Sequence, residues 1–283
     1  MKLSRRWLIN YFLFVLIVLF TWIGNRYDLQ TGEQKANAVS TLEANRIDRF
    51  SIQTTDEAIE IKRDDSGWQI TSPIQWPADQ VNMERMLDIT NAETDSKIAA
   101  SEIDLNEFGL QFPRTSMRLN DTSVAFGITN NIGERRYTMI DSTVYLLPDI
   151  YHPFISQGLL AVVDRRLLPG SLNLQSLQLP DLVIARDDQA WLKDGEAASD
   201  SVPLEDMVGN WQGLEATRIK RFNSTATPRQ KIIVELANGE ILEYFLMSIA
   251  PEIVIAHPRL GLQYHFSDDH YYQLVSLPHD ETS

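Results

Sequence analysis

Residues 7–24 of this chain, WLINYFLFVLIVLFTWIG, form one apolar run in which only Asn10 and Thr21 are clearly polar and no side chain is charged. An α-helix rises about 1.5 Å per residue, so this run would form a helix roughly 27 Å long, close to the thickness of a bilayer's hydrocarbon core. We therefore predict a transmembrane helix over 7–24, and this helix decides where the rest of the chain lies.

The flanking residues predict both the orientation and the fate of this helix. Lys2, Arg5 and Arg6 precede it, and positive charge on that side favours a cytoplasmic N-terminus. A cleavable signal peptide has a shorter apolar region followed closely by small residues, whereas the nearest small-x-small triplet here is Ala36-Asn37-Ala38. We favour an uncut anchor over a cleaved signal peptide or a buried core helix, with 1–6 as a cytoplasmic tail.

The composition narrows the compartment and the classes of partner. The formal net charge is −14, which argues against a nucleic-acid partner, because such binding relies on Lys and Arg to neutralise phosphates. The chain has no cysteine, so disulfides, thiolate metal sites and cysteine nucleophiles are excluded. Together with the anchor, this predicts a single-pass protein of a bacterial inner membrane whose body faces the periplasm.

The body is expected to be α+β, with antiparallel β-meanders that each pack against a helix. After a polar linker at 25–44, short segments alternate apolar and polar side chains, and Asp64-Asp65-Ser66-Gly67 has the composition of a turn. Asp79 can cap a helix in which Met83, Met86, Leu87 and Thr90 share one face. A mostly helical segment is expected over 149–163.

The second half of the chain repeats the order of these elements. LVIARDDQAWLK resembles IEIKRDDSGWQI, a helix around Met207 follows in the same place, and Asn238-Gly239 marks a hairpin that matches the one at Asn120-Asp121. Trp191 lies 123 residues after Trp68, and Tyr264 lies 119 residues after Tyr145. We predict a duplicated module, with copies at 45–165 and 172–277 and a C-terminal tail at 278–283. The short apolar joint near 165–170 favours copies that pack together.

Three stretches of the first copy resemble DUF4340, a bacterial domain of unknown function. They are GWQITSPIQWPADQVNMERML (67–87), EFGLQFP (107–113) and RRYTMIDSTVYLLPD (135–149). The family pattern has a Gly-Trp strand, a Pro-Ala-Asp helix start, a Gly-Leu-x-x-Pro turn and a hairpin that bears a Tyr. The second copy resembles it less, because Ser201-Val202-Pro203 replaces the Pro-Ala-Asp triplet and the Gly-Leu-x-x-Pro turn is not evident.

The resemblance implies a role in the cell envelope but no catalytic residue. Members of the family are similar in having one N-terminal membrane helix and an exported body. Some are encoded beside ABC-type permeases and gliding-motility-like auxiliary transport proteins, which implies an accessory role in the envelope. The family supplies no catalytic residue.

Candidate site residues each have a simpler structural interpretation. His265 and His270, with Asp268 and Asp269 between them, do not have the spacing of a zinc site. Asp79 is interpreted as a helix cap, and the doublets Asp64-Asp65 and Asp187-Asp188 as turn residues. We accordingly expect no catalytic, metal-binding or cofactor-binding residue.

The aromatic and basic side chains also have structural interpretations. Four tryptophans could line a sugar-binding groove, but the equivalence of Trp68 and Trp191 in the two copies favours core packing; the other two are Trp76 and Trp211. The doublets Arg135-Arg136 and Arg165-Arg166 are expected at solvated or salt-bridged edges, with docking on anionic lipid as the alternative.

Two functions remain open on the sequence alone. The first is a non-enzymatic, membrane-anchored periplasmic accessory protein that binds another envelope protein, such as a component of an ABC permease. The alternative is a periplasmic domain that binds or hydrolyses a carbohydrate or cell-wall ligand, which would require a deep pocket with convergent polar groups between the copies.

Overall fold

The computed structural model describes residues 38–277 apart from 41, 95, 131–132, 189 and 198–201. Within these residues no helix is long and apolar enough to cross a membrane. The anchor predicted at 7–24, the tails at 1–6 and 278–283, and most of the linker at 25–44 lie outside the described residues.

The described chain folds into two antiparallel sheets of nine strands each, so the predicted pair of β-rich α+β halves is confirmed. The strands of the first sheet run from Arg49 to Pro148 and those of the second from Leu174 to Ser267. The division into separate domains at 45–165 and 172–277 stays a prediction.

The first half contains short helices as well as its sheet. Its strands are β1 (Arg49–Gln53), β2 (Ala58–Asp64), β3 (Gly67–Ser72), β4 (Trp76–Pro77), β5 (Lys97–Ala99), β6 (Thr115–Leu119), β7 (Thr122–Asn130), β8 (Arg135–Ile140) and β9 (Thr143–Pro148). Its helices are η1 (Ala44–Arg46), α2 (Gln80–Leu87), η2 (Asp88–Asn91), η3 (Ala100–Glu102), α3 (His152–Ile155) and α4 (Leu159–Val162).

The second half repeats this inventory with small differences. Its strands are β10 (Leu174–Leu179), β11 (Leu182–Asp187), β12 (Ala190–Lys193), β13 (Glu196–Ala197), β14 (Arg218–Arg221), β15 (Gln230–Leu236), β16 (Ile241–Ser248), β17 (Glu252–His257) and β18 (Leu262–Ser267). Its helices are α5 (Val202–Gly213), η4 (Pro258–Leu260), η5 (Asp268–His270) and α6 (Tyr271–Leu274).

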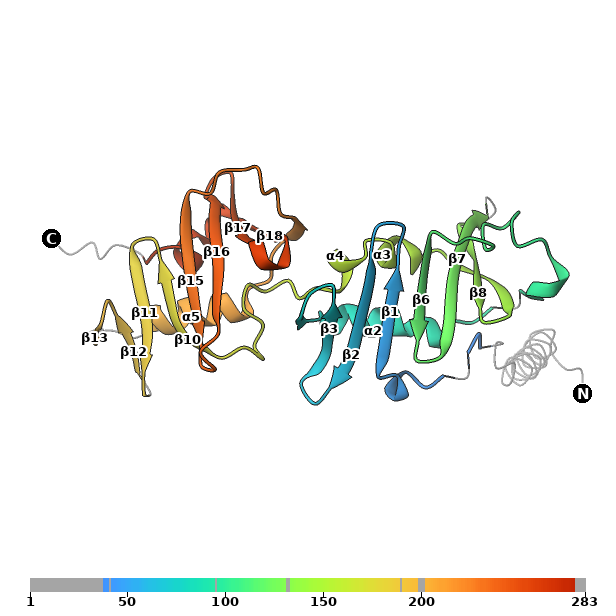
Figure 1. Ribbon diagram of the computed structural model, residues 1–283, viewed down its shortest axis with the longest axis horizontal. Helices are drawn as coiled ribbons and strands as arrows, with labels where there is room; N and C mark the ends of the chain where they lie inside the picture. The colour runs from blue at the N-terminus through green and yellow to red at the C-terminus, as the bar shows by residue number, and fades with distance from the viewer. Residues whose placement is uncertain are drawn as a thin grey trace, which may run out of the picture.

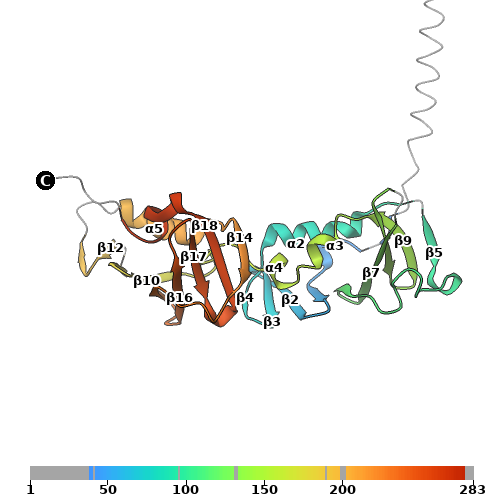
Figure 2. The same cartoon turned by 90° about the horizontal axis from the view of Figure 1, so that it is seen from above.

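The two sheets have the same strand order, which supports duplication of one folding unit. The first runs β4-β3-β2-β1-β6-β7-β8-β9-β5 and the second runs β13-β12-β11-β10-β15-β16-β17-β18-β14. Adding nine to each strand number converts the first order into the second. Figure 1 shows the sheets following one another along the long axis, and in Figure 2 α2, α3, α4 and α5 lie along one side of them.

Alternating burial explains why these segments form strands with one face on the core. In β1 the side chains of Phe50 and Ile52 are buried between exposed or half-buried neighbours, and in β2 Ile59 and Ile61 are buried in the same way. Successive strand residues point to opposite faces, so this pattern places one face of the sheet against the helices.

Helix α2 begins where the sequence predicts. The Asp79 carboxylate accepts a hydrogen bond from the Asn82 backbone N–H at 3.0 Å, which satisfies a donor at the helix start. Gln80 ties the helix to the sheet, because its side-chain amide accepts from the Trp68 N–H at 2.8 Å and donates to the carbonyls of Trp68 and Ala78. The helix start therefore also fixes the position of β3.

The helical segment expected over 149–163 is interrupted. Two single-turn helices, α3 and α4, are separated at Gly158, whose φ of +60° is available to glycine at low cost. A Cβ at this position would lie 2.2 Å from the Glu57 carboxylate, which accepts a hydrogen bond from the Leu159 N–H at 2.9 Å. Close approach of a long-range partner breaks the helix, and local sequence patterns do not show such a partner.

The equivalent tryptophans of the two halves differ in burial. Trp68 is 1% exposed and meets Phe50 edge to face with 6.4 Å between ring centroids. Trp191 is only half-buried and packs at the margin of the core, with the Arg186 guanidinium 5.9 Å from its ring. The expectation of core packing is thus correct for Trp68 and only partly correct for Trp191.

This difference allows a matched test of core packing. Replacing Trp68 with Ala should lower the free energy of unfolding by about 3–5 kcal/mol, because a large side chain is removed from a closed core. The same change at Trp191 should cost no more than about 1 kcal/mol, because much of its ring already contacts water. Urea unfolding of both variants measures the difference, and equal losses would contradict this account of the core.

Candidate functional site

The candidate site lies where the two halves meet. Figure 1 shows the second sheet beside the first with β18 toward β3, and Figure 2 shows β14 next to β4. The edges that face each other are different edges of the repeated unit, since β14 corresponds to β5 and not to β4. The contact is therefore head to tail.

The joint between the halves is held by backbone hydrogen bonds. Arg165 and Ala216 are paired through the Ala216 N–H and the Arg165 carbonyl at 2.9 Å, and the Arg165 side chain donates back to the Ala216 carbonyl. Leu167 and Leu168 are buried, and the Tyr244 hydroxyl donates to the Leu167 carbonyl at 2.6 Å. The apolar joint thus packs closely against the second half, in keeping with the prediction that the copies pack together.

Three rings meet across this joint. Trp76 of the first half and His257 of the second lie edge to face with ring centroids 5.3 Å apart, and the ring centroid of Tyr244 lies 4.5 Å from that of His257. Trp76 is 5% exposed and His257 is 1% exposed. Among the described residues, neither ring nitrogen of His257 nor the indole N–H of Trp76 has a hydrogen-bond partner.

Burial between these rings changes the acid–base behaviour of His257. Removal from water lowers the pKa of His257 from 6.5 to about 3, and the positive charge of Arg259 acts in the same direction. The imidazole is therefore neutral at physiological pH and packs as an apolar ring.

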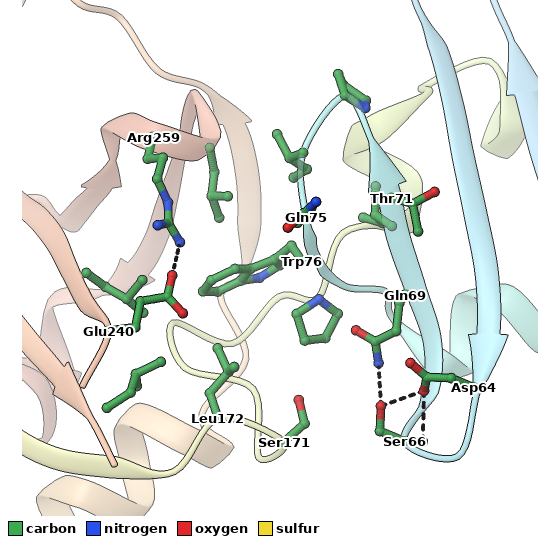
Figure 3. Close-up of a pocket in the computed structure, with 17 residues that line it drawn as sticks. Asp64, Ser66, Gln69, Thr71, Gln75, Trp76, Ser171, Leu172, Glu240 and Arg259 are labelled. Atoms are coloured by element: carbon green, nitrogen blue, oxygen red, sulfur yellow. Dashed lines mark hydrogen bonds and ion pairs between the residues drawn. The ribbon is translucent and has the colours of Figure 1, made fainter. Parts of the chain in front are cut away.

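Above Trp76 the surface opens into a groove of about 740 Å³ that both halves line. Figure 3 shows Trp76 between a wall from the second half, with Glu240 and Arg259, and a wall from the first half, with Gln69 and Thr71. Buried apolar side chains, including Leu242 and Leu260, complete the lining. We call this space the junction groove.

The polar groups of the junction groove form local pairs. Arg259 donates to the Glu240 carboxylate at 2.7 Å on one wall, with both side chains partly exposed. On the other wall the Asp64 carboxylate accepts from the Ser66 hydroxyl at 2.6 Å, and Gln69 donates to the same hydroxyl. These groups can donate to and accept from a bound molecule, as a binding surface requires.

The histidines considered as metal ligands lie apart from this groove. His265 is buried on β18 with Nδ1 3.1 Å from Glu252, and His270 is in η5 with Nδ1 2.6 Å from Gln273. No group of three or more possible ligands occurs in the described part of the chain. Each imidazole has its own protein partner.

The other candidates have structural roles. Asp64 forms the turn before β3, in which Gly67 has a φ of +107°, and Asp188 is a turn residue with a φ of +49°. Arg136 makes a largely buried ion pair with Asp149 at 2.8 Å, which holds the pKa of that carboxyl below its usual value. Arg166 pairs with Asp164. The expectation of salt-bridged edges is confirmed for Arg136 and Arg166.

The sequence did not identify the groove residues as a site. Pro73 and Pro77 flank Trp76, and this clustering around an aromatic residue was the available signal for a special edge. The sequence around His257 does not indicate its role, because its burial depends on the distant ring of Trp76 in the other half.

The profile of the family described as "Domain of unknown function (DUF4340)" matches residues 68–246. This chain belongs to the DUF4340 family. The match starts in β3 and ends in β16, so in this DUF4340 protein it crosses the joint and includes much of the junction groove. Searches of curated proteins and of solved structures gave no match.

The buried imidazole predicts a specific acid sensitivity. Unfolding lets His257 take up a proton below its ordinary pKa of 6.5, whereas the folded protein resists protonation down to about pH 3. Its contribution to stability is complete above pH 6.5 and falls as the pH drops, by about 1.4 kcal/mol at pH 5.5.

The variant His257→Phe keeps a ring in the aromatic contact and removes the titration. Urea unfolding at pH 7.5 and 5.5 should therefore show a larger acid-induced loss in the parent protein than in the variant. Identical losses in the two proteins would contradict the neutral, buried imidazole.

Proposed function

We propose that this DUF4340 protein is a non-enzymatic accessory protein of the bacterial envelope that binds a partner protein at the junction groove. In this proposal residues 7–24 anchor it in the inner membrane, and its body lies in the periplasm. The partner would be an envelope protein, with components of an ABC-type permease as the first candidates. Nucleic acid is not proposed as a partner, because the chain is acidic.

The observation that carries the proposal is the junction groove itself. Neither half forms it alone, and its lining combines buried apolar residues with amide, hydroxyl and charged side chains. Such a lining is typical of recognition sites. The groove is also held by a joint with many hydrogen bonds, so a bound segment would meet a prearranged surface.

The membrane and transport parts of the proposal rest on the sequence. The apolar run at 7–24 has the length of a bilayer span, and the basic residues before it favour an exported body. The association with a permease rests on what the DUF4340 resemblance implies.

The carbohydrate alternative has less support from the groove. A sugar ring stacks on an open aromatic face, whereas Trp76 is only 5% exposed and its indole N–H is buried. A segment of polypeptide can instead use the apolar floor and the amide and hydroxyl walls. We therefore propose a protein partner.

The anchor can be tested by fractionation of cells that produce the protein with a C-terminal tag. The full chain should remain in the inner-membrane fraction after a carbonate wash, and protease added to spheroplasts should remove the tag. A chain lacking residues 1–24 should be found in the soluble cytoplasm. A full chain that is soluble, or a tag protected from protease, would contradict the anchor and its orientation.

The groove can be tested by photo-crosslinking in the same cells. A photoreactive residue at Gln75, which is exposed in the groove, should give a discrete crosslinked band. The same probe at Val183, an exposed position on β11 outside the groove, serves as the control. Loss of the Gln75 band on substituting Glu240→Lys would support the groove, whereas equal crosslinks at both positions would refute it.

A further inference from the structure

A second surface, separate from the junction groove, lies between α2 and α3 of the first half. A pocket of about 330 Å³ opens there, and most of its lining is apolar: Met86, Ile150, Tyr151, Phe154 and Ile155. Ile150 is 67% exposed at its edge. A pocket of this size is at the lower end of the range for ligand sites and suits one large side chain.

The helices of the second half that correspond to α2 and α3 are α5 and α6, and a tryptophan connects them. Trp211 on α5 is fully buried, and its indole N–H donates to the Leu274 carbonyl of α6 at 3.0 Å. Helices α5 and α6 pack directly on each other. An indole provided by the chain itself thus ties these two elements.

The first half has a different residue at the equivalent position. Aligning the buried positions of α2 with those of α5 places Thr90 opposite Trp211. Thr90 lies in η2, directly after α2, and its hydroxyl donates to the Leu87 carbonyl at 2.8 Å. The pocket therefore lies between the two elements that a tryptophan joins in the other copy.

The residues at the rim of the pocket also differ between the two copies. Pairing Tyr145 with Tyr264 in the equivalent strands places Ile150 opposite Asp269 and Phe154 opposite Gln273. The second copy thus has polar residues where the first presents apolar ones.

The charge around the pocket restricts what can bind. Beside the pocket, α2 and η2 carry two carboxylates, Glu84 and Asp88, and one cation, Arg85. In the second half, α5 and η5 carry four more carboxylates and no Lys or Arg; these carboxylates belong to Glu205, Asp206, Asp268 and Asp269. The strands carry most of the basic residues instead. An acidic layer repels anionic lipid and favours a basic partner.

We propose that the pocket between α2 and α3 receives one aromatic side chain, of the size of an indole, from a basic segment of a partner protein. The aromatic ring would contact Met86 and Phe154, and neighbouring Lys or Arg residues would lie beside the carboxylates of Glu84 and Asp88. Aromatic anchors in small pockets commonly provide much of the affinity of such contacts. This surface does not depend on the junction groove being a binding site.

The test uses the full-length protein in phosphatidylcholine nanodiscs and fluorescein-labelled peptides in an anisotropy titration. The probe is a peptide with one Trp flanked by two Lys on each side. Its controls replace the Trp with Ala, or the four Lys with Glu, and empty nanodiscs give the blank. The probe should bind at least ten-fold more tightly than either control peptide.

Two variants of the protein copy the second half and so introduce residues that the same fold already accepts. Phe154→Gln and Ile150→Asp should each weaken binding of the probe at least ten-fold. Ile241→Asp, a change at an equally exposed isoleucine on β16, and Glu240→Gln in the junction groove should leave binding unchanged.

Three results would overturn the proposal. Equal affinity for the three peptides would show that no aromatic ring is recognised. Unchanged binding to Ile150→Asp, whose exposed side chain the fold does not need, would place the site elsewhere. Loss of binding in Glu240→Gln alone would assign the peptide to the junction groove.

Discussion

The joint between the halves is the constraint on which the architecture depends. Backbone pairing between Arg165 and Ala216, the Tyr244 hydrogen bond to Leu167 and the contact of Trp76 with His257 all cross it. Each of these contacts joins segments that are distant in sequence, and together they leave one apolar core with residues from both sheets. The junction groove exists because this joint fixes two walls that come from different halves.

The head-to-tail contact uses unlike edges of the repeated unit, and the two copies differ at the edge that carries Trp76 in the first copy. Repeated units that pack through unlike edges could add further units at either end, unless the end surfaces are changed. In the first copy the edge at β4 presents Trp76 to its neighbour, whereas the corresponding edge of the second copy, β13, consists of Glu196 and Ala197. Both residues of β13 are exposed, whereas both residues of β4 are buried.

Much of the fold could be predicted from local patterns. The strands around Phe50 and Ile61, the Asp79 cap and the Asn238-Gly239 hairpin follow from alternation, capping and turn chemistry, and the duplication follows from their order. The break at Gly158 could not be predicted in this way, because it depends on Glu57 from another part of the chain. The same reason applies to His257, whose burial depends on Trp76 from the other half.

Glu57 shows how closely the two halves are coupled. One of its carboxylate oxygens accepts from the Leu159 N–H at the start of α4, and the other pairs with Arg221 at the end of β14. A single side chain therefore sets both the end of a helical segment in one copy and the attachment of an edge strand in the other. The bond to Leu159 stays within the first half, whereas the ion pair with Arg221 joins the two halves, so Glu57 links the loop around Gly158 directly to the second sheet.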